Sequence, residues 1–574
     1  MNKDEAICLY DKIFNQTTGC CAKLGTKSSN SKSIITHYRS KHGIDVDEYL
    51  REQSEKAQQS MSSFLKEKKF TEIWTLNSVV AKLVAVNFIK INAIATSFEI
   101  QKLLSREFGM TLSNFRDIRA AVINHSEEIR TLIKSEIAAG LEKNEQVMIS
   151  FDEWTSGGNV QFINLIVFQA KNSFNLGLIN VVDAANSNNL LKYIRERLEH
   201  FDVPFDKVKF LIADGASVNS KIAKMANLHI HRCYNHGIQL AIMDTVYEMR
   251  QLAEESIQEE SDEDADDLND DVTIPQETPA YEDLSMKFSD LVGKVRSLSK
   301  TLRKTNSEKV LFRYTHAKML LDCSTRWTSL STMIERFLFN CQNNAVQKAC
   351  IDLHLKFDFT PEDLESLAEI DDIVFAATEI IYKLSYAEAN LNTADLAVSE
   401  AITKLEFGSS FLRTQFPSSI RKRFLQRRSD VSDVLAYFLA KRVNQEGNLF
   451  YNKPTNETIK KYIKLFNPEL LQQSKLSQQF QSINAAESSM NVDLDDNYAP
   501  NGDIDSAIAL FDTTGIYGCL KPFVVNLMAI RPTSTDNERS FSIAGMIITP
   551  RSQSMKVDLV DANLIINRFY RNGK

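Results

Sequence analysis

Two aspartates stand where apolar runs of the sequence end. Asp152 follows VMISF, and Asp214 follows VKFLIA and precedes Gly215. If both runs are buried strands, the two carboxylates lie at the sheet edge where α/β proteins bind their ligands. Neighbouring carboxylates repel each other unless a cation lies between them, and Mg²⁺ prefers oxygen ligands of this kind. The pair therefore predicts a divalent-metal site, with simple turn formers or helix caps as the alternative.

Phosphoryl chemistry at such a site needs a further acid, and composition does not select it. Glu538, in STDNERSFSIAGMIITPR, opens a helical pattern and is one candidate. Two divalent ions held by carboxylates can activate a water molecule and stabilise the leaving oxygen of a phosphodiester. A glutamate in the first turn of a helix also has a simpler explanation, because it complements the helix dipole.

The elements that must position these acids form an α/β layer. Residues 147–236 contain four apolar runs rich in Val, Ile and Phe, namely VMISFDEW, FINLIVFQA, FNLGLINVVDA and VKFLIADGA. Such runs, bounded by Asn, Gly and Ser, are typical of buried strands. Between the third and fourth runs, LLKYIRERLEHF predicts a crossover helix. The expected order is strand, strand, strand, helix, strand.

Helical periodicity dominates the chain on both sides of this layer. It extends over 44–139, returns after Asp271, and is broken by the polar stretch 472–502 before two further helical patterns within 521–569. Apolar positions recurring at three and four residues indicate amphipathic helices. The α/β layer is therefore expected to be followed by a large, mostly helical region.

The net charge of −8 conceals an uneven distribution. Between Glu254 and Asp271 the chain carries eleven acids and no Lys or Arg, so the remainder is weakly basic. The acidic run predicts a disordered loop, because it buries too little apolar area to offset its ordering entropy. Basic clusters at 294–318 and 421–428 could neutralise a phosphate backbone or form solvated helix faces.

Composition excludes several classes of protein. The 43% hydrophobic and 25% charged residues are near globular averages, which excludes a disordered or fibrous chain. No run of about 18 uncharged apolar residues predicts a membrane span, and the acidic N-terminus does not predict a secretory signal. Eight unevenly spaced cysteines do not form a disulfide framework, so we expect a reduced, intracellular protein.

Five segments together resemble the hAT superfamily of DNA transposases, the Hermes, hobo and Ac group. They occur in the family's order and span about 420 residues. The segments are FDEWTS at 151–156, FLIADGASVNS at 210–220, HRCYNHGIQLAIMD at 231–244, CSTRWTSLSTMIERF at 323–337, and NERSFSIAGMIITPRSQSM with its C-terminal helix at 537–569. The resemblance implies an α/β fold with a ribonuclease-H-like catalytic core, interrupted by a large all-α insertion.

The same resemblance implies a DDE triad. It maps onto Asp152, Asp214 and Glu538, which would hold two Mg²⁺ or Mn²⁺ ions. The implied reaction is cut-and-paste transposition, in which strand cleavage is followed by hairpin formation and strand transfer.

The resemblance also implies DNA contacts outside the triad. Cys233 and His236 match the family's Cys-x-x-His motif, which lies near the scissile phosphate. Trp154, and Trp327 after Arg326, match tryptophans linked to stabilising a flipped base, which needs an aromatic face. From the residues alone, a zinc half-site for the first pair and ordinary core packing for the tryptophans remain open.

The N-terminus departs from the zinc finger that often begins these transposases. The second half of a BED finger is matched by two histidines, but Asp11 stands where the second cysteine belongs. Cys20, Cys21 or Asp11 itself could complete a Zn²⁺ site, or the finger is degenerate. The candidate zinc ligands are Cys8, His37 and His42.

These expectations divide the chain into five parts. They are a BED-like finger (1–50), a helical intermediate region for DNA binding and oligomerisation (51–140), the first part of the catalytic core (141–237), the helical insertion with an acidic loop at 254–272 (238–520), and the second part of the core with a dimerisation helix (521–574).

The resemblance favours a nuclear DNA transposase. Its partners would be double-stranded DNA, as terminal inverted repeats and target, and further copies of the same chain, with no membrane. The alternative is a domesticated DNA-binding protein or transcription regulator that has lost transposition, which the irregular finger favours and the complete set of acids opposes.

Overall fold

The computed structural model describes residues 5–7, 23–25, 75–112, 114–246, 279–322, 328–406, 410–440, 447–471, 508, 511, 520–548 and 555–571. The chain divides into two compact units, Met1–Trp74 with Lys574 and Thr75–Gly573. In the first unit, β1 (Glu5–Ile7) and β2 (Lys23–Gly25) pair antiparallel. The zinc candidates Cys8, His37 and His42 lie outside the described residues.

A mixed five-stranded sheet lies at the centre of the second unit. The strands are β3 (Val147–Thr155), β4 (Gln161–Gln169), β5 (Asn172–Asn180), β6 (Val208–Ala213) and β7 (His229–Arg232). Their order is β5-β4-β3-β6-β7; β3, β4 and β5 run antiparallel in sequence, and β6 and β7 extend the sheet parallel to β3. The coarse α/β prediction is confirmed, and the four predicted strands are β3 to β6. The strand β7 was not predicted, because its sequence HIHR lacks an apolar run.

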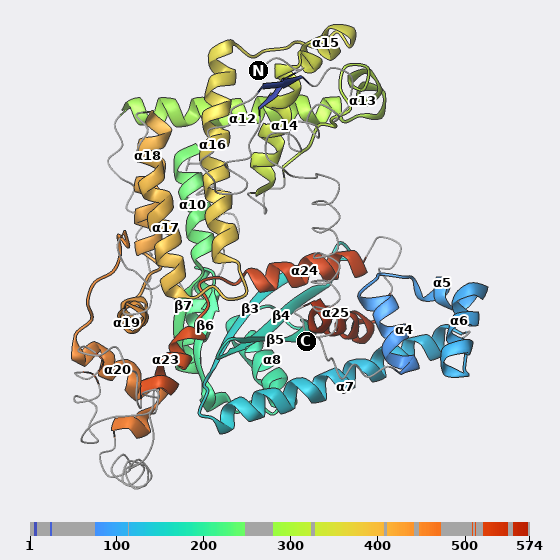
Figure 1. Ribbon diagram of the computed structural model, residues 1–574, viewed down its shortest axis with the longest axis vertical. Helices are drawn as coiled ribbons and strands as arrows, with labels where there is room; N and C mark the ends of the chain where they lie inside the picture. The colour runs from blue at the N-terminus through green and yellow to red at the C-terminus, as the bar shows by residue number, and fades with distance from the viewer. Residues whose placement is uncertain are drawn as a thin grey trace. The chain divides into compact units, whose positions relative to one another are not determined.

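One face of the sheet packs against helices from before and after it. Alternate residues of β3, such as Val147, Ile149 and Phe151, point into this core, because side chains alternate across a strand. The long helix α7 runs along the sheet (Figure 1). The helices of this core are α4 (Leu76–Ala85), α5 (Ile91–Thr96), α6 (Phe98–Phe108), α7 (Phe115–Glu142), α8 (Ser187–His200), α9 (Ser217–Ala226) and α25 (Val557–Arg571).

The other face carries the helical block. Met148, Phe168 and Phe210 of the sheet share one buried cluster with α10 (Tyr234–Val246), and this cluster continues through the block. The sheet and the block therefore share one continuous apolar core. The remaining helices of this cluster are α12 (Pro279–Leu302), α13 (Thr305–Leu311), α14 (Thr328–Gln342), α15 (Ala345–Asp352), α16 (Pro361–Leu384), α17 (Leu391–Leu405), α18 (Phe411–Leu425), α19 (Asp430–Leu439), α20 (Asn456–Phe466) and α23 (Lys521–Met528), and the 3₁₀ turns of the unit are η1 (Phe205–Lys207) and η2 (Pro468–Leu471).

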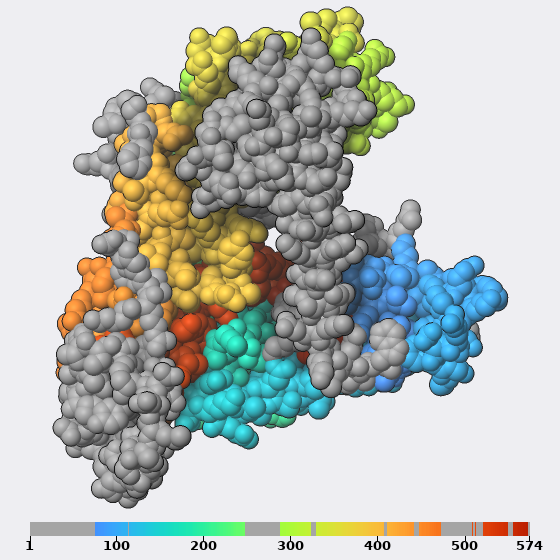
Figure 2. Space-filling model, in the orientation of Figure 1, coloured from blue at the N-terminus to red at the C-terminus, as the bar shows by residue number. Residues whose placement is uncertain are grey.

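The chain returns to the sheet at its C-terminal end. α24 (Thr535–Ile547) lies across β3 and β4 (Figure 1) and buries Phe541 against Phe162 and Leu178 in a small third cluster. In the space-filling view, the red C-terminal segments meet the teal sheet region and the yellow helices of the block (Figure 2). None of the helices in the described ranges has the length and apolarity that a bilayer crossing requires.

A buried ion cluster attaches α25 to the edge strand β5. Asp561 accepts a hydrogen bond from the Leu178 backbone N–H at 2.7 Å and pairs with the guanidinium groups of Arg130 at 2.8 Å and Arg197 at 3.2 Å. Gly177 adopts φ +93°, and a Cβ there would lie 2.0 Å from Asp561 Oδ1, so only glycine allows this approach.

We expect Asp561→Ala to lower the free energy of unfolding by about 3–5 kcal/mol, because it removes the buried carboxylate that Arg130 and Arg197 share and leaves Arg130 only its exposed partner Glu127. Urea unfolding followed by circular dichroism measures the loss. Asp558 of the same helix is the matched control: its side chain is 55% exposed and pairs with Arg119, so Asp558→Ala should cost about 1 kcal/mol or less. Equal losses in the two variants would contradict a structural role for the Asp561 cluster.

Candidate active site

Strand register brings Asp152 and Asp214 to neighbouring positions. In the parallel pair β3–β6, Met148 lies opposite Phe210 and Ser150 opposite Ile212. Continuing that register by two residues places Asp152 beside Asp214, on the face of the sheet that carries the helical block. Neighbouring strands are about 4.8 Å apart, so the two residues are neighbours. The prediction that both acids stand at strand ends is wrong for Asp152, because β3 continues to Thr155 and pairs Asp152 with Asn164 of β4.

Burial and neighbouring acids both affect the pKa of Asp152. Burial raises the pKa of Asp152 from its ordinary value of 3.8 to about 7, and the negative charges of Asp214, Glu538 and Glu153 add to the rise, while the Glu153 N–H donated to Oδ1 at 2.9 Å opposes it. Burial also raises the pKa of Glu153, as does Asp214, although Gln161 donates a hydrogen bond to Glu153 at 2.9 Å. The protein thus concentrates negative charge where water is partly excluded.

Asp214 is held by the turn that follows β6. Its Oδ1 accepts hydrogen bonds from the Ala216 backbone N–H at 3.0 Å and from the Asn219 side chain at 2.7 Å. Both donors belong to the start of α9. Asp214 therefore also caps this turn, which is the simpler alternative that the sequence left open. Within the described residues, no donor bonds to Oδ2. One carboxylate oxygen of Asp214 is therefore fixed by the start of α9.

A buried polar network fixes α24 to the sheet. Asn537, fully buried, donates to the Ser150 hydroxyl at 2.8 Å and accepts from the Asn164 side chain at 2.7 Å. One turn further on, the Ser540 hydroxyl accepts from Asn175 at 2.8 Å. α24 is therefore bonded to β3, β4 and β5 through side chains that water does not reach.

Glu538 follows Asn537 and is exposed in the first turn of α24. Its negative charge raises the pKa of Asp152 and also that of Cys233, beyond the effect of burial on each. Such an effect requires proximity, since charge interactions fall off with distance and with solvent screening. The charges of Asp214 and Glu538 thus both act on Asp152, although hundreds of residues separate Asp214 from Glu538.

Cys233 ties the end of β7 to the segment before α24. Its thiol is buried and accepts a hydrogen bond from the Ser534 backbone N–H at 3.4 Å, and its own N–H donates to the Ala213 carbonyl at 2.7 Å. Burial raises the pKa of the Cys233 thiol. Cys233 thus links the end of β7 to the segment that leads into α24.

His236 lies one turn into α10, on the side of the acids. Burial lowers the pKa of His236, and the positive charge of Arg427 lowers it further, while Asp214 opposes the change. The imidazole is therefore neutral at physiological pH and can donate or accept a hydrogen bond without adding charge. Charges of the candidate site act on both residues of this motif: Glu538 raises the pKa of Cys233, and Asp214 raises the pKa of His236.

Trp154 is packed rather than open. Its ring stacks against Phe162 of β4 and Phe541 of α24, each at 5.9 Å between centroids. This packing agrees with the core alternative and helps to seat α24 on the sheet. Arg326 and Trp327, the other predicted DNA contacts, lie outside the described residues.

The donor chemistry at the site suits hard divalent cations. Asp152, Asp214 and Glu538 supply carboxylate oxygens only, which are the ligands that Mg²⁺ and Mn²⁺ take. Among the described residues, no three His, Cys, Asp or Glu side chains stand close enough to enclose an ion as they are. Asp152 is held within β3, and Asp214 is held by hydrogen bonds from the start of α9.

Comparison with known proteins does not assign a family. No protein-family model matches the chain, and no curated protein matches it at a significant level. The likeness to hAT transposases therefore rests on the motifs themselves and remains a prediction. The geometry of the site must carry the functional argument.

Sequence reasoning missed the residues that hold the site together. Asn164 is the only polar residue inside the apolar run FINLIVF, which is a signal for a buried hydrogen bond. Ser150 and Asn175 gave no such signal, because each is ordinary in a strand. Nothing in the local sequence indicated that Arg427, which follows α18, lies beside Gly215 and Gly237.

We expect Asp152→Asn to stabilise the protein without added metal at about pH 8, by about 1–3 kcal/mol after allowance for screening. Between pH 3.8 and about 7 the folded chain holds a proton on Asp152 that the unfolded chain has released, so the stability of the wild type falls as pH rises through that window. The advantage of the variant should vanish at about pH 3.5, where the side chain is protonated in both states.

Urea unfolding at the two pH values measures this difference. Asp202→Asn is the control, because the Asp202 side chain is 75% exposed in its pair with Lys134 and should change stability little at either pH. If Asp152→Asn were less stable than the wild type at the higher pH, the ionised Asp152 carboxylate would not be destabilising the folded state.

We expect Asn537→Ala to lower the free energy of unfolding by about 3 kcal/mol, because it leaves the Ser150 hydroxyl and the Asn164 amide buried without their partner. The adjacent Glu538→Ala, an exposed position, should change it by about 0.5 kcal/mol or less. Urea unfolding of both variants makes the comparison. If the two losses were equal, the network would not be what holds α24.

Proposed function

We propose that this chain is a DDE-type DNA transposase that uses Asp152, Asp214 and Glu538 to cleave and join DNA strands with divalent metal ions. The observation that carries the proposal is geometric: strand register sets Asp152 beside Asp214, and the Asn537 network fixes the first turn of α24, which bears Glu538, to β3 and β4. A protein has little reason to bring three carboxylates together at a sheet edge unless a cation offsets their repulsion.

The sheet supports a ribonuclease-H-like core as the finer description of the fold. Three antiparallel strands in sequence are extended by two parallel strands, in the order β5-β4-β3-β6-β7. Asp152 lies within the first of these strands, Asp214 directly follows the fourth, and Glu538 stands on a helix from the far end of the chain. This is the arrangement that the motifs imply.

The chain's own residues account for several requirements of the reaction. The three carboxylates would hold two Mg²⁺ or Mn²⁺ ions, which supply an activated water and stabilise a leaving oxygen. The hydrogen bonds from Ala216 and Asn219 orient Asp214 before any ligand arrives. The neutral His236 can accept or donate a hydrogen bond beside the reacting phosphate without competing for the cations.

The proposed partner is double-stranded DNA, bound as terminal inverted repeats and as target. A second copy of the chain is expected to bind with it as a homodimer or a higher homo-oligomer. The Asn537 network and the Cys233 contact fix the segment that carries Glu538 on two sides. A rigid support of this kind keeps a reacting phosphodiester aligned, which contributes much of the rate in phosphoryl transfer.

The decisive experiment is cleavage of DNA that carries the inverted repeats flanking the coding sequence. With Mg²⁺ or Mn²⁺ the wild type should cut at the ends, while Asp152→Asn, Asp214→Asn and Glu538→Gln each lose about 100-fold or more in rate. Asp202→Asn, which removes a distant exposed acid, should cut as the wild type does. Gel analysis of end-labelled DNA gives the rates and shows whether hairpins form.

Metal binding provides an independent readout. Mg²⁺ should raise the melting temperature of the wild type and of Asp202→Asn but not that of Asp152→Asn, because a ligand stabilises only the state that binds it. Cleavage by Asp152→Asn at the wild-type rate would refute the triad. Specific binding of the repeats without cleavage would favour the domesticated DNA-binding protein instead.

A further inference from the structure

The C-terminal end of α18 and the residues after it carry three arginines, Arg423, Arg427 and Arg428. Arg423 forms a double hydrogen bond to Asp244 of α10, with both distances at 2.6 Å. Arg427 and Arg428 follow one turn later. Sequence analysis identified this cluster only as a basic patch that could meet DNA or solvent.

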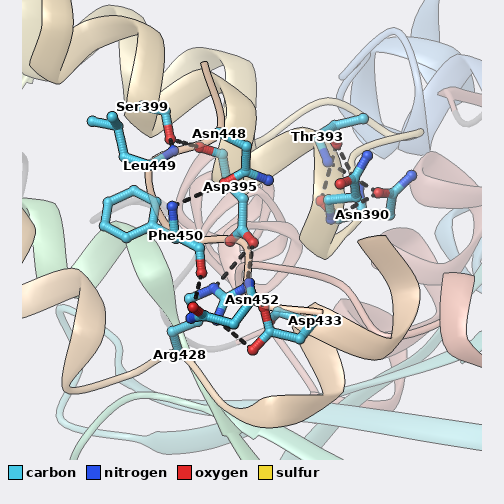
Figure 3. A network of polar contacts seen from close by, with 12 residues as sticks. Asn390, Thr393, Asp395, Ser399, Arg428, Asp433, Asn448, Leu449, Phe450 and Asn452 are labelled. Carbon is cyan, nitrogen blue, oxygen red and sulfur yellow. Dashed lines mark hydrogen bonds and ion pairs between the residues drawn. The ribbon is translucent and has the colours of Figure 1, made fainter. Parts of the chain in front are cut away.

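Arg428 is committed to the interior of the helical block. Its guanidinium pairs with Asp395 of α17 at 2.9 Å and with Asp433 of α19 at 2.6 Å, and its side chain is 6% exposed (Figure 3). Asp433 also accepts the Asn452 backbone N–H at 2.8 Å. Arg428 is therefore a fixed anchor and cannot serve a ligand.

Arg427 lies on a different side of the same turn, against the candidate site. A Cβ on Gly237, one residue after His236, would lie 2.9 Å from Arg427 Cδ, and a Cβ on Gly215, one residue after Asp214, would lie 3.7 Å from its guanidinium nitrogen. One nitrogen donates to the Arg423 carbonyl at 3.2 Å. The side chain is thus wedged between the two segments that carry Asp214 and His236.

We propose that Arg427 binds a phosphate group of the DNA strand beside Asp214, so that the helical block supplies a cation to the site formed by the sheet. This inference rests on the proposed function, and it assigns to the block a direct part in substrate binding. The strand brought to three carboxylates carries negative charge of its own, and a positive group next to Asp214 offsets it.

Burial makes this arginine effective. Arg427 is 9% exposed, and its neighbours Arg423 and Arg428 are held by ion pairs on either side. A charge held in a partly dry site interacts more strongly than one in water, and it needs no reorganisation when the phosphate arrives. The shift that Arg427 imposes on the pKa of His236 shows that its field reaches the site.

The test replaces Arg427 and single phosphates in parallel. The variants are Arg427→Gln, Arg427→Lys and the control Arg413→Gln. The control removes the same charge from α18, the helix that precedes Arg427, where Arg413 pairs with Asp372 at 3.0 Å. The DNA carries the inverted repeat with one methylphosphonate, a neutral group, at each position near the cut in turn. Binding is measured by fluorescence anisotropy in Ca²⁺ and cleavage in Mg²⁺.

If the inference is correct, Arg427→Gln weakens binding or cleavage about 10-fold or more and lowers the salt slope of binding by about one, while Arg413→Gln does not. One methylphosphonate should weaken the wild type and leave Arg427→Gln unchanged, which a purely structural role would not produce. Arg427→Lys should recover part of the loss, since it keeps the charge without the planar fork.

Two results would overturn the inference. The first is Arg427→Gln behaving as Arg413→Gln does. The second is a wild type for which no methylphosphonate position matters, and this arm holds even if the Arg427 variants do not fold. A wild type that binds but does not cleave overturns the proposed function alone, because the anisotropy measurement still tests Arg427.

Discussion

A small group of buried amides and hydroxyls determines whether the candidate site exists. Asn537 bonds at once to Ser150 and Asn164, which lie on adjacent strands. Buried polar groups demand partners, and the cost of leaving them unpaired makes such bonds directional in a way that apolar packing is not. Because Glu538 is the next residue, the register of α24 on the sheet decides where the third acid lies.

Ionised Asp152 lowers the stability of the folded state. Burial and neighbouring negative charge hold the pKa of Asp152 at about 7, so ionising it without a cation is unfavourable. Hydrogen bonds elsewhere compensate, through the Asp561 ion cluster and the contact of the Cys233 thiol with Ser534. A group placed where it destabilises the folded state, yet supported on every side, is typical of a functional site.

The helical block and the sheet are not independent parts. One apolar core runs from Met148 and Phe210 into the block, and Arg423 and Arg428 fix the end of α18 by ion pairs. Rigid docking of this kind lets a residue of the block stand beside acids of the sheet. The block therefore has a structural reason to influence chemistry at the sheet edge.

The sequence by itself determined the strands β3 to β6 and the helix between β5 and β6, because apolar periodicity is a local signal. It singled out Asp152 and Asp214 by their place after apolar runs and Glu538 only through motif order, and it gave no sign of the contacts of Asn175 or Arg427. Those contacts join residues far apart in the chain, and they arise only when buried polar groups and charges find partners during packing. The tertiary structure alone decided that Asp152 and Asp214 lie in register and that Arg427 packs beside Gly215 and Gly237.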